Sequence, residues 1–280
     1  MKQALKMREK HDMKLYLASD IEGSCGFTIP EEGEKGTPTY SYFARQMALE
    51  AAAACRGAHA AGAEDILVHD AHATARNIDP TLLPEYVSIM RRSGADPYAM
   101  VSGMQLGGYD AFFMTGFHSW VSSVGSPASH TFNHRTTRMT LNGLPLSEFL
   151  FDTYSAASLG VPTPFISGDA NICAFAASIV PGITTVTTVQ GFGAGSISPH
   201  PEKVLKEIEA KSEQALSGNY RRCMPNLPSR FRFEVSFFDH IEADFNSYYP
   251  GIQRMDDCTL VYESDSWYDI LLMVHFVLDK

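Results

Sequence analysis

Short apolar runs of strand length alternate along the chain with longer segments that have the character of helices. Apolar runs of strand length recur at residues 14–19, 65–69, 111–115, 164–167, 183–189, 231–237 and 259–262. Longer segments without interior proline predict helices over residues 40–61, 147–159, 201–216 and 265–278. Asn142-Gly143 lies between apolar flanks, which predicts a β-hairpin over residues 138–146.

The order of these elements indicates the fold class. Strands and helices alternate, which predicts an α/β fold with a mostly parallel central sheet flanked by helices. The hairpin predicts a smaller β-containing lobe. Residues 1–12 are charged and lack an apolar core, so we expect them to form a disordered N-terminal extension. Residues 13–280 contain no repeat and no long linker, and we expect them to form one unit.

The composition narrows the class of partner. The 280 residues are 45% hydrophobic and 19% charged, as in a globular protein. The net charge of −10 and the lack of a basic cluster argue against nucleic acid and anionic membranes. No apolar run reaches the ~18 residues of a membrane span. Five scattered cysteines without a C-x-x-C pair favour a reducing cytoplasm over a disulfide framework.

Potential metal ligands follow several of the predicted strands. They are Asp20 and Glu22 after the first strand, Asp70 and His72 after the second, His118 after the third, and Glu148 after the hairpin. In α/β sheets, ligands gather at the carboxyl ends of the strands. The period-two spacing of Asp20 and Glu22 points both carboxylates to one side of an extended backbone. Histidines with an excess of carboxylates suit zinc and a two-metal site, although a single acid at a strand end is usually a helix cap or a solvated loop residue, and a single histidine is usually packed or exposed.

A further histidine is a candidate for proton transfer. His130 ends a loop of small residues, and the pKa of an imidazole lies near neutral pH. A loop histidine bonded to backbone is the alternative interpretation, and His134 is a second candidate for the same role. Residues 191–196 (GFGAGS) look like a dinucleotide loop, but no βαβ unit opens on them, so we give them no cofactor role.

From about Met13 to the C-terminus, the order and spacing of motifs resemble one enzyme family. The shared motifs are Asp20-Ile21-Glu22-Gly23, Asp70-Ala71-His72, Gly116-Phe117-His118, Ser129-His130, Asn142-Gly143, Glu148 and Gly168-Asp169, with Tyr42, Arg45, Met47 and Glu50 in the first helix. The chain is similar to the zinc-dependent dipeptide D-aminopeptidases that are encoded with bacterial dipeptide transporters. One departure is the stretch Thr188-Val189-Gln190-Gly191, where the resemblance leads us to expect a lysine, so the substrate preference is open.

The resemblance implies a function and a site. Residues 13–280 would be a catalytic unit that hydrolyses short peptides with an N-terminal D-residue, such as D-Ala-D-Ala. The implied zinc ligands, for two Zn²⁺ ions per subunit, are Asp20, Glu22, His72, His118 and Glu148, with Asp20 as the bridging ligand. His130 would be the catalytic side chain, as base or as nucleophile. The family forms a homodecamer around an inner chamber, which implies a homo-oligomer with short peptides as substrates.

Two other functions stay open at this point. The same metal site could serve an amidase or an L-peptide hydrolase, because the specificity pockets are not readable from the sequence. The chain could also be a peptide-binding protein without catalysis. Stereochemical preference and product release separate these alternatives from the D-aminopeptidase.

Overall fold

A seven-stranded sheet forms the centre of the computed structural model, which describes residues 13–278. Its strands are β1 (Met13–Ser19), β2 (Ala63–Asp70), β3 (Val87–Arg91), β4 (Ala111–Phe117), β7 (Phe165–Asp169), β8 (Thr184–Phe192) and β9 (Gly195–Ile197). Their order across the sheet is β3-β2-β1-β4-β7-β8-β9, and every pairing is parallel except that of β8 with β9. The chain therefore moves outward from β1 in one direction through β2 and β3, and in the other through β4.

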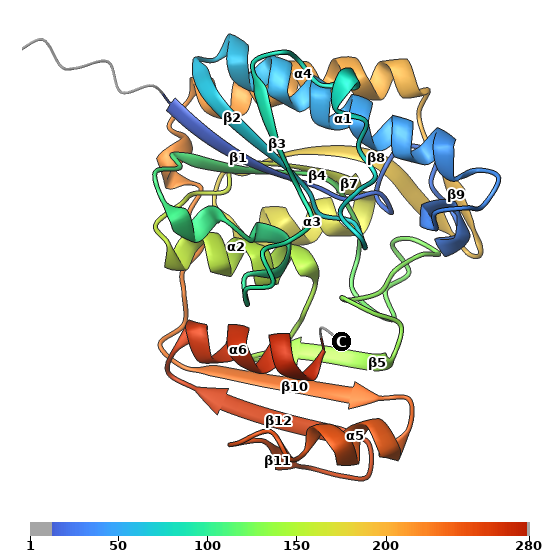
Figure 1. Ribbon diagram of the computed structural model, residues 1–280, viewed down its shortest axis with the longest axis vertical. Coiled ribbons are helices and arrows are strands. Elements are labelled where there is room, and N and C mark those ends of the chain that lie inside the picture. Colours follow the sequence, from blue (N-terminus) through green and yellow to red (C-terminus); the bar gives the residue numbers. More distant parts are fainter. Residues whose placement is uncertain (1–12, 279–280) are drawn as a thin grey trace, which may run out of the picture.

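Helices cover both faces of this sheet (Figure 1). On one face, α1 (Tyr40–Ala60) packs along α4 (Pro201–Ser217). On the other face lie α2 (Glu148–Ser158) and α3 (Ala170–Ile179). Short 3-10 turns connect the elements at Pro30–Gly33, Pro80–Leu82, Ala99–Val101, Met104–Leu106 and Tyr220–Arg222. No helix within residues 13–278 is both long and apolar enough to cross a membrane.

The strands are apolar on both sides because both faces of the sheet are buried. In β1, Leu15 and Leu17 pack toward α1, whereas Tyr16 and Ala18 pack into the opposite apolar cluster. All four side chains are fully buried. A strand that is buried on both faces has a nearly continuous run of apolar residues in its sequence, as β1 does.

A second, smaller sheet packs below the helices α2 and α6 in Figure 1. It is antiparallel, with the order β11-β12-β10-β5-β6. Its strands are β5 (Thr136–Leu141), β6 (Leu144–Pro145), β10 (Phe231–Phe237), β11 (Gln253–Arg254) and β12 (Thr259–Ser264), accompanied by α5 (His240–Asn246) and α6 (Trp267–Val277). Asn142 and Gly143 make the predicted hairpin turn, with φ of 51° and 80°, as a two-residue turn between these strands requires.

The structure confirms the predicted fold class, an α/β fold with a mostly parallel sheet and a smaller β lobe. The sequence patterns missed β3, α3 and α5. Residues 170–179 are small or apolar except for Asn171, so they show no helical periodicity, yet Asp169 caps them by accepting the Ile172 N–H at 2.8 Å. The predicted extension over residues 1–12 lies outside the described residues, and the boundary at residue 13 stays a prediction.

Candidate metal centre

The candidate ligands lie where three neighbouring strands end. Asp20 follows β1, His72 comes two residues after β2, and His118 directly follows β4. Because these strands are parallel and adjacent, their carboxyl ends meet at one edge of the sheet. The chain changes direction between β1 and β4, and such a switch point is where ligands bind in open α/β sheets.

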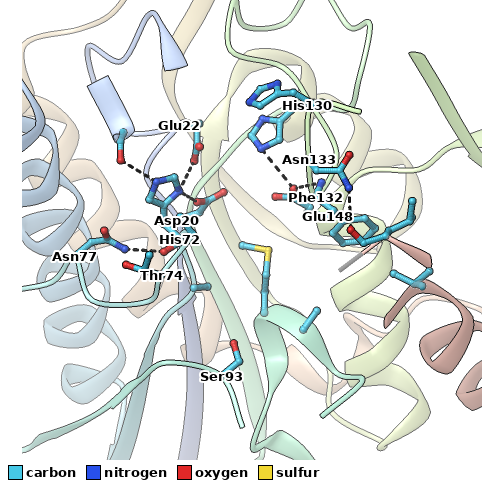
Figure 2. A pocket seen from close by; sticks show the side chains of 18 of the residues that line it. Asp20, Glu22, His72, Thr74, Asn77, Ser93, His130, Phe132, Asn133 and Glu148 are labelled. Carbon is cyan, nitrogen blue, oxygen red and sulfur yellow. Dashed lines mark hydrogen bonds and ion pairs between the residues drawn. The ribbon is translucent and has the colours of Figure 1, made fainter. Parts of the chain in front are cut away.

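Asp20, Glu22 and His72 form the first group of donors. His72 Nδ1 lies 3.3 Å from Asp20 Oδ1 and 3.1 Å from Glu22 Oε2, as the dashed lines in Figure 2 show. On the far side of the ring, His72 Nε2 lies 3.1 Å from the Gly33 carbonyl oxygen. A ring N–H donated to that carbonyl fixes the tautomer and leaves the Nδ1 lone pair directed at the carboxylates.

His118, Glu148 and His130 form the second group. His118 Nε2 lies 3.2 Å from Glu148 Oε2, and its Nδ1 lies 2.9 Å from the Ser119 carbonyl. Glu148 is the first residue of α2, whose N-cap Ser147 accepts the Leu150 N–H at 3.1 Å. The other Glu148 oxygen accepts the Phe132 N–H at 2.6 Å. Helix capping and this backbone bond together fix the direction of the Glu148 carboxylate.

Asp20 connects the two groups. Its Oδ1 faces His72, and its Oδ2 lies 3.5 Å from His118 Nε2. Asp20 Oδ2, Glu22 Oε2 and His118 Nε2 are buried and have no hydrogen-bond partner among residues 13–278. Each of the triads Asp20–Glu22–His72 and His118–His130–Glu148 brings its donor atoms within 4.8 Å of one another. Buried oxygen and nitrogen donors that converge without partners fit metal ions, and a carboxylate with one oxygen toward each group fits a bridge between two ions.

The charges of the two groups depend on each other. Burial and the charge of Glu22 raise the pKa of Asp20 to about 7. Burial also opposes ionisation of Glu22, but the neighbouring His72 outweighs it and holds the pKa of Glu22 well below its usual range. In the same way, the carboxylates Glu22 and Asp20 outweigh burial and hold the pKa of His72 well above normal. The charged forms of His72 and Glu22 therefore stabilise each other.

His130 is the member of the second group that lies farthest from the Glu148 carboxylate. Its Nε2 lies 3.9 Å from Glu148 Oε1, and its Nδ1 lies 3.0 Å from the Ala128 carbonyl. The ring stacks on His118 with a centroid separation of 4.3 Å, and His134 stacks on its outer face at 4.5 Å. Burial and the charge of His118 lower the pKa of His130. The ring is thus held with Nε2 toward the carboxylates and the cavity (Figure 2).

Two glycines allow the ends of β1 and β4 to approach closely enough for this arrangement. Gly23 donates its N–H to the Gly116 carbonyl at 2.8 Å. A Cβ on Gly23 would lie 1.8 Å from the Phe117 carbonyl oxygen, and one on Gly116 would lie 2.1 Å from the Asp20 carbonyl oxygen. Gly116 also has φ of +71°, a conformation that L-residues with side chains rarely adopt. The D-x-E-G and G-F-H motifs therefore need glycine for steric reasons.

A cavity of about 490 Å³ opens onto these residues. Asp20, Glu22, His72, His130 and Glu148 line its inner end, and residues 93–100 and 274–278 contribute to its walls. Carboxylates, imidazoles and apolar side chains therefore share one space, large enough for a short peptide. Such a cavity with a few converging polar groups is typical of a substrate site.

The five implied zinc ligands and His130 come together here, whereas the carboxylate of Asp70, the other potential ligand, accepts the N–H groups of Asn77 and Ile78. Sequence reasoning missed their backbone partners, the Gly33 carbonyl and the Phe132 N–H, because neither position has a distinctive residue type. His69 points away from the site, with Nδ1 2.7 Å from the Met100 carbonyl. The glycine-rich stretch at residues 191–196 forms the antiparallel β8–β9 turn and no phosphate loop before a helix.

Comparisons with known proteins identify the family of the chain. A search of curated protein sequences found no match. Among solved structures, the fold is similar to that of the Zn-dependent D-aminopeptidase DppA from Bacillus subtilis, described as a self-compartmentalizing protease. The TM-score is 0.86 at 21% sequence identity, over 95% of this chain and 97% of that one. The family model of D-aminopeptidases matches residues 13–276. The chain therefore belongs to the D-aminopeptidase family of peptidases, the family that its motifs resemble.

Proposed function

We propose that the protein is a zinc-dependent aminopeptidase that hydrolyses short peptides with a D-residue at the N-terminus, such as D-Ala-D-Ala. The observation that carries this proposal is the shared Asp20 carboxylate, with one oxygen toward His72 and the other toward His118. Family membership supplies the class of reaction and the preference for D-residues. The similar structure of a Zn-dependent enzyme supports zinc as the metal.

Five residues would hold two zinc ions. Asp20, Glu22 and His72 would bind the first, and Asp20, His118 and Glu148 the second. When bound, the two ions supply Lewis acidity toward the scissile carbonyl and a nucleophile at neutral pH. The carboxylates of Glu22 and Glu148 also give the cavity an anionic floor, which attracts the ammonium group of an N-terminal residue. We assign the amine to Glu22, which lies at the cavity and would place the first peptide bond beside His130.

His130 would move the proton in this reaction. Because its Nδ1 faces the Ala128 carbonyl, the N–H at Nδ1 is committed to that bond and Nε2 is left to exchange a proton. The Nε2 atom faces the cavity at 3.9 Å from Glu148. From there it can take a proton from the nucleophile and pass it to the leaving amine. We favour this role over direct attack, because stacking between His118 and His134 holds the ring in one plane.

Amino-acid release from defined dipeptides tests the proposal. The purified protein is loaded with zinc and assayed on D-Ala-D-Ala and L-Ala-L-Ala, then again after chelation. Zinc-dependent release from the D-dipeptide alone is the expected result. Release from the L-dipeptide would indicate an L-peptide hydrolase, and release from neither, with zinc still bound, would contradict the proposed peptidase activity and favour an amidase or a binding protein.

His130→Ala tests the catalytic assignment, with His134→Ala as the matched control. The two imidazoles stack on each other, but only His130 faces Glu148. We expect His130→Ala to keep its zinc and lose activity by at least ~100-fold, as expected for a general acid–base group. His134→Ala should keep most of the activity. Full activity of His130→Ala would exclude its role in proton transfer.

We also propose that the protein assembles into a cytoplasmic homo-oligomer, with a decamer as the expected size. Large apolar side chains remain exposed around α5 of the smaller lobe, including Phe238 (68% exposed), Ile241 (68%) and Tyr248 (80%). Large exposed apolar side chains close together in the sequence suit an interface. Sedimentation velocity tests the assembly. A monomer at micromolar concentration would contradict it.

A further inference from the structure

The cavity above the proposed metal centre has an uneven distribution of charge. Its acidic lining residues are Asp20, Glu22, Glu34, Asp96 and Glu148. Among the described residues that line it, Lys35 is the only lysine or arginine. A dipeptide substrate carries an ammonium group at one end and a carboxylate at the other. The acidic lining suits the ammonium group, so recognition of the carboxylate calls for a separate cationic group.

The backbone around Lys35 is held in a defined turn. Thr37 donates its N–H to the Glu34 carbonyl at 3.2 Å, which makes Lys35 and Gly36 the central residues of a β-turn. The Thr37 hydroxyl also bonds the carbonyls of Glu31 and Glu34 at 2.8 and 2.9 Å. Gly36 has φ of +106°, as the second central residue of a type II turn requires. Lys35 is therefore presented from a hydrogen-bonded corner and not from a loose loop.

The Lys35 ammonium group is not neutralised by an ion pair. The side chain is exposed, and no carboxylate in the part of the chain described, residues 13–278, forms a salt bridge with it. Arg91 and Arg92, at the end of β3, do not line the cavity. Lys35 thus offers a positive charge whose hydrogen-bond donors are available to a ligand.

The maximum reach of the Lys35 side chain, which lines the cavity, is compatible with a substrate of two residues. Lys35 lies two residues after Gly33, whose carbonyl oxygen is 3.1 Å from His72 Nε2. Two residues span at most about 7 Å, and the four-carbon stem of lysine can cover a similar distance back toward the ligands. In a dipeptide, the terminal carboxylate lies about 4 Å beyond the scissile bond, because one residue spans at most about 3.6 Å. A longer peptide would carry its carboxylate past this position.

We propose that Lys35 binds the C-terminal carboxylate of a dipeptide substrate and so sets a preference for free dipeptides over amidated or longer peptides. This inference rests on the proposed function. Lys35 acts in binding and touches neither the proposed metal ligands nor the scissile bond, so its loss should raise KM with little change in kcat.

The experiment compares a dipeptide with its own amide. Values of kcat/KM are measured for D-Ala-D-Ala and D-Ala-D-alaninamide with the wild type, Lys35→Gln, Lys35→Arg and Lys206→Gln. Lys206 is an exposed lysine of α4 that does not line the cavity, and it serves as the control. We expect the wild type to prefer the acid by roughly tenfold, in line with a hydrogen bond between charged groups. Lys35→Gln should lose that preference, Lys35→Arg should keep most of it, and Lys206→Gln should not alter it.

Two results would overturn the inference. One is a Lys35→Gln variant that keeps the acid-over-amide ratio of the wild type. The other is a variant that loses activity equally on both compounds, which would indicate a structural role. If the wild type hydrolyses neither compound, the proposed function fails instead, and titration calorimetry with the same two compounds decides the role of Lys35. Tighter binding of the acid that disappears in Lys35→Gln supports the inference, and equal binding of both compounds by the wild type refutes it.

Discussion

Glu50 makes the free energy of unfolding of this protein depend on pH, because its carboxyl group is buried in the folded chain. This α1 residue is fully buried, and its Oε1 accepts the Cys25 N–H and the Gln46 amide, each at 2.8 Å. Its Oε2 has no partner among the described residues. The bond to Cys25 ties α1 to the loop that follows Glu22, so this carboxyl supports the segment carrying two of the proposed ligands. Burial raises the pKa of Glu50 from 4.5 to about 7.

The direction of the effect follows from proton linkage. Below pH 4.5 the carboxyl is protonated in both the folded and the unfolded chain, and its full contribution to stability is present. Between pH 4.5 and about 7 the folded state holds a proton that the unfolded state has released, so stability falls as pH rises. A shift of this size corresponds to a loss of about 3 kcal/mol in the free energy of unfolding, at 1.36 kcal/mol per pKa unit.

Glu50→Gln removes this titration while keeping the Oε1 acceptor. We expect the difference in unfolding free energy between variant and wild type to move in favour of the variant by about 3 kcal/mol from pH 4.5 to pH 8. Urea denaturation of metal-free protein at fixed protein concentration measures it, because bound metal and assembly also shift stability. Glu207→Gln on the surface of α4 is the control. Parallel curves for wild type and Glu50→Gln would refute the reasoning.

Three further variants test the site and its support. Asp20→Asn should reduce bound zinc from two ions per subunit to one or none, because an amide bridges metals poorly. Atomic absorption measures the zinc content, and two zinc ions per subunit in this variant would exclude the bridging role of Asp20. Gly23→Ala forces a Cβ against the Phe117 carbonyl oxygen and should cost about 3 kcal/mol in denaturant unfolding, whereas Gly218→Ala, with open space around it, should be nearly neutral. Trp267→Ala removes the ring that packs between Phe151 and Phe231 and should cost about 3–5 kcal/mol, and a loss under 1 kcal/mol would show that α6 is not needed to join the two sheets.

The strand ends could be predicted from the sequence because burial on both faces makes each central strand a continuous apolar run. Polar residues that directly follow such a run lie at the edge of the sheet, as Asp20 and His118 do. Glu148 could be placed by the hairpin before it and by Ser147 as a helix cap. The resemblance to the D-aminopeptidases supplied the role of each site residue. The spacing alone would not have distinguished the proposed zinc ligands from the other carboxylates near the strand ends.

Other features could not be read from local patterns. The helix α3 has no polar face to give a helical period, because its residues pack against β7 and β8 with small side chains on the exposed side. The Gly33 carbonyl that orients His72 is an ordinary backbone group 39 positions earlier in the chain. Lys35 lies in a polar turn, where a lysine is unremarkable in sequence. Its importance in our proposal comes only from the cavity that the fold closes around it.

The use of Asp20 by both ligand groups has a consequence for synthesis of the chain. Asp20, Glu22 and His72 all precede residue 73, whereas His118 follows β4 and Glu148 follows the hairpin of β5 and β6. A nascent polypeptide emerges from its N-terminus, so the first ligand group leaves the ribosome well before the second. We expect the partly made chain to hold metal weakly, and tight uptake to follow once α2 has folded against β4. Occupancy of the metal centre would then report that β1, β2, β4 and α2 have come together.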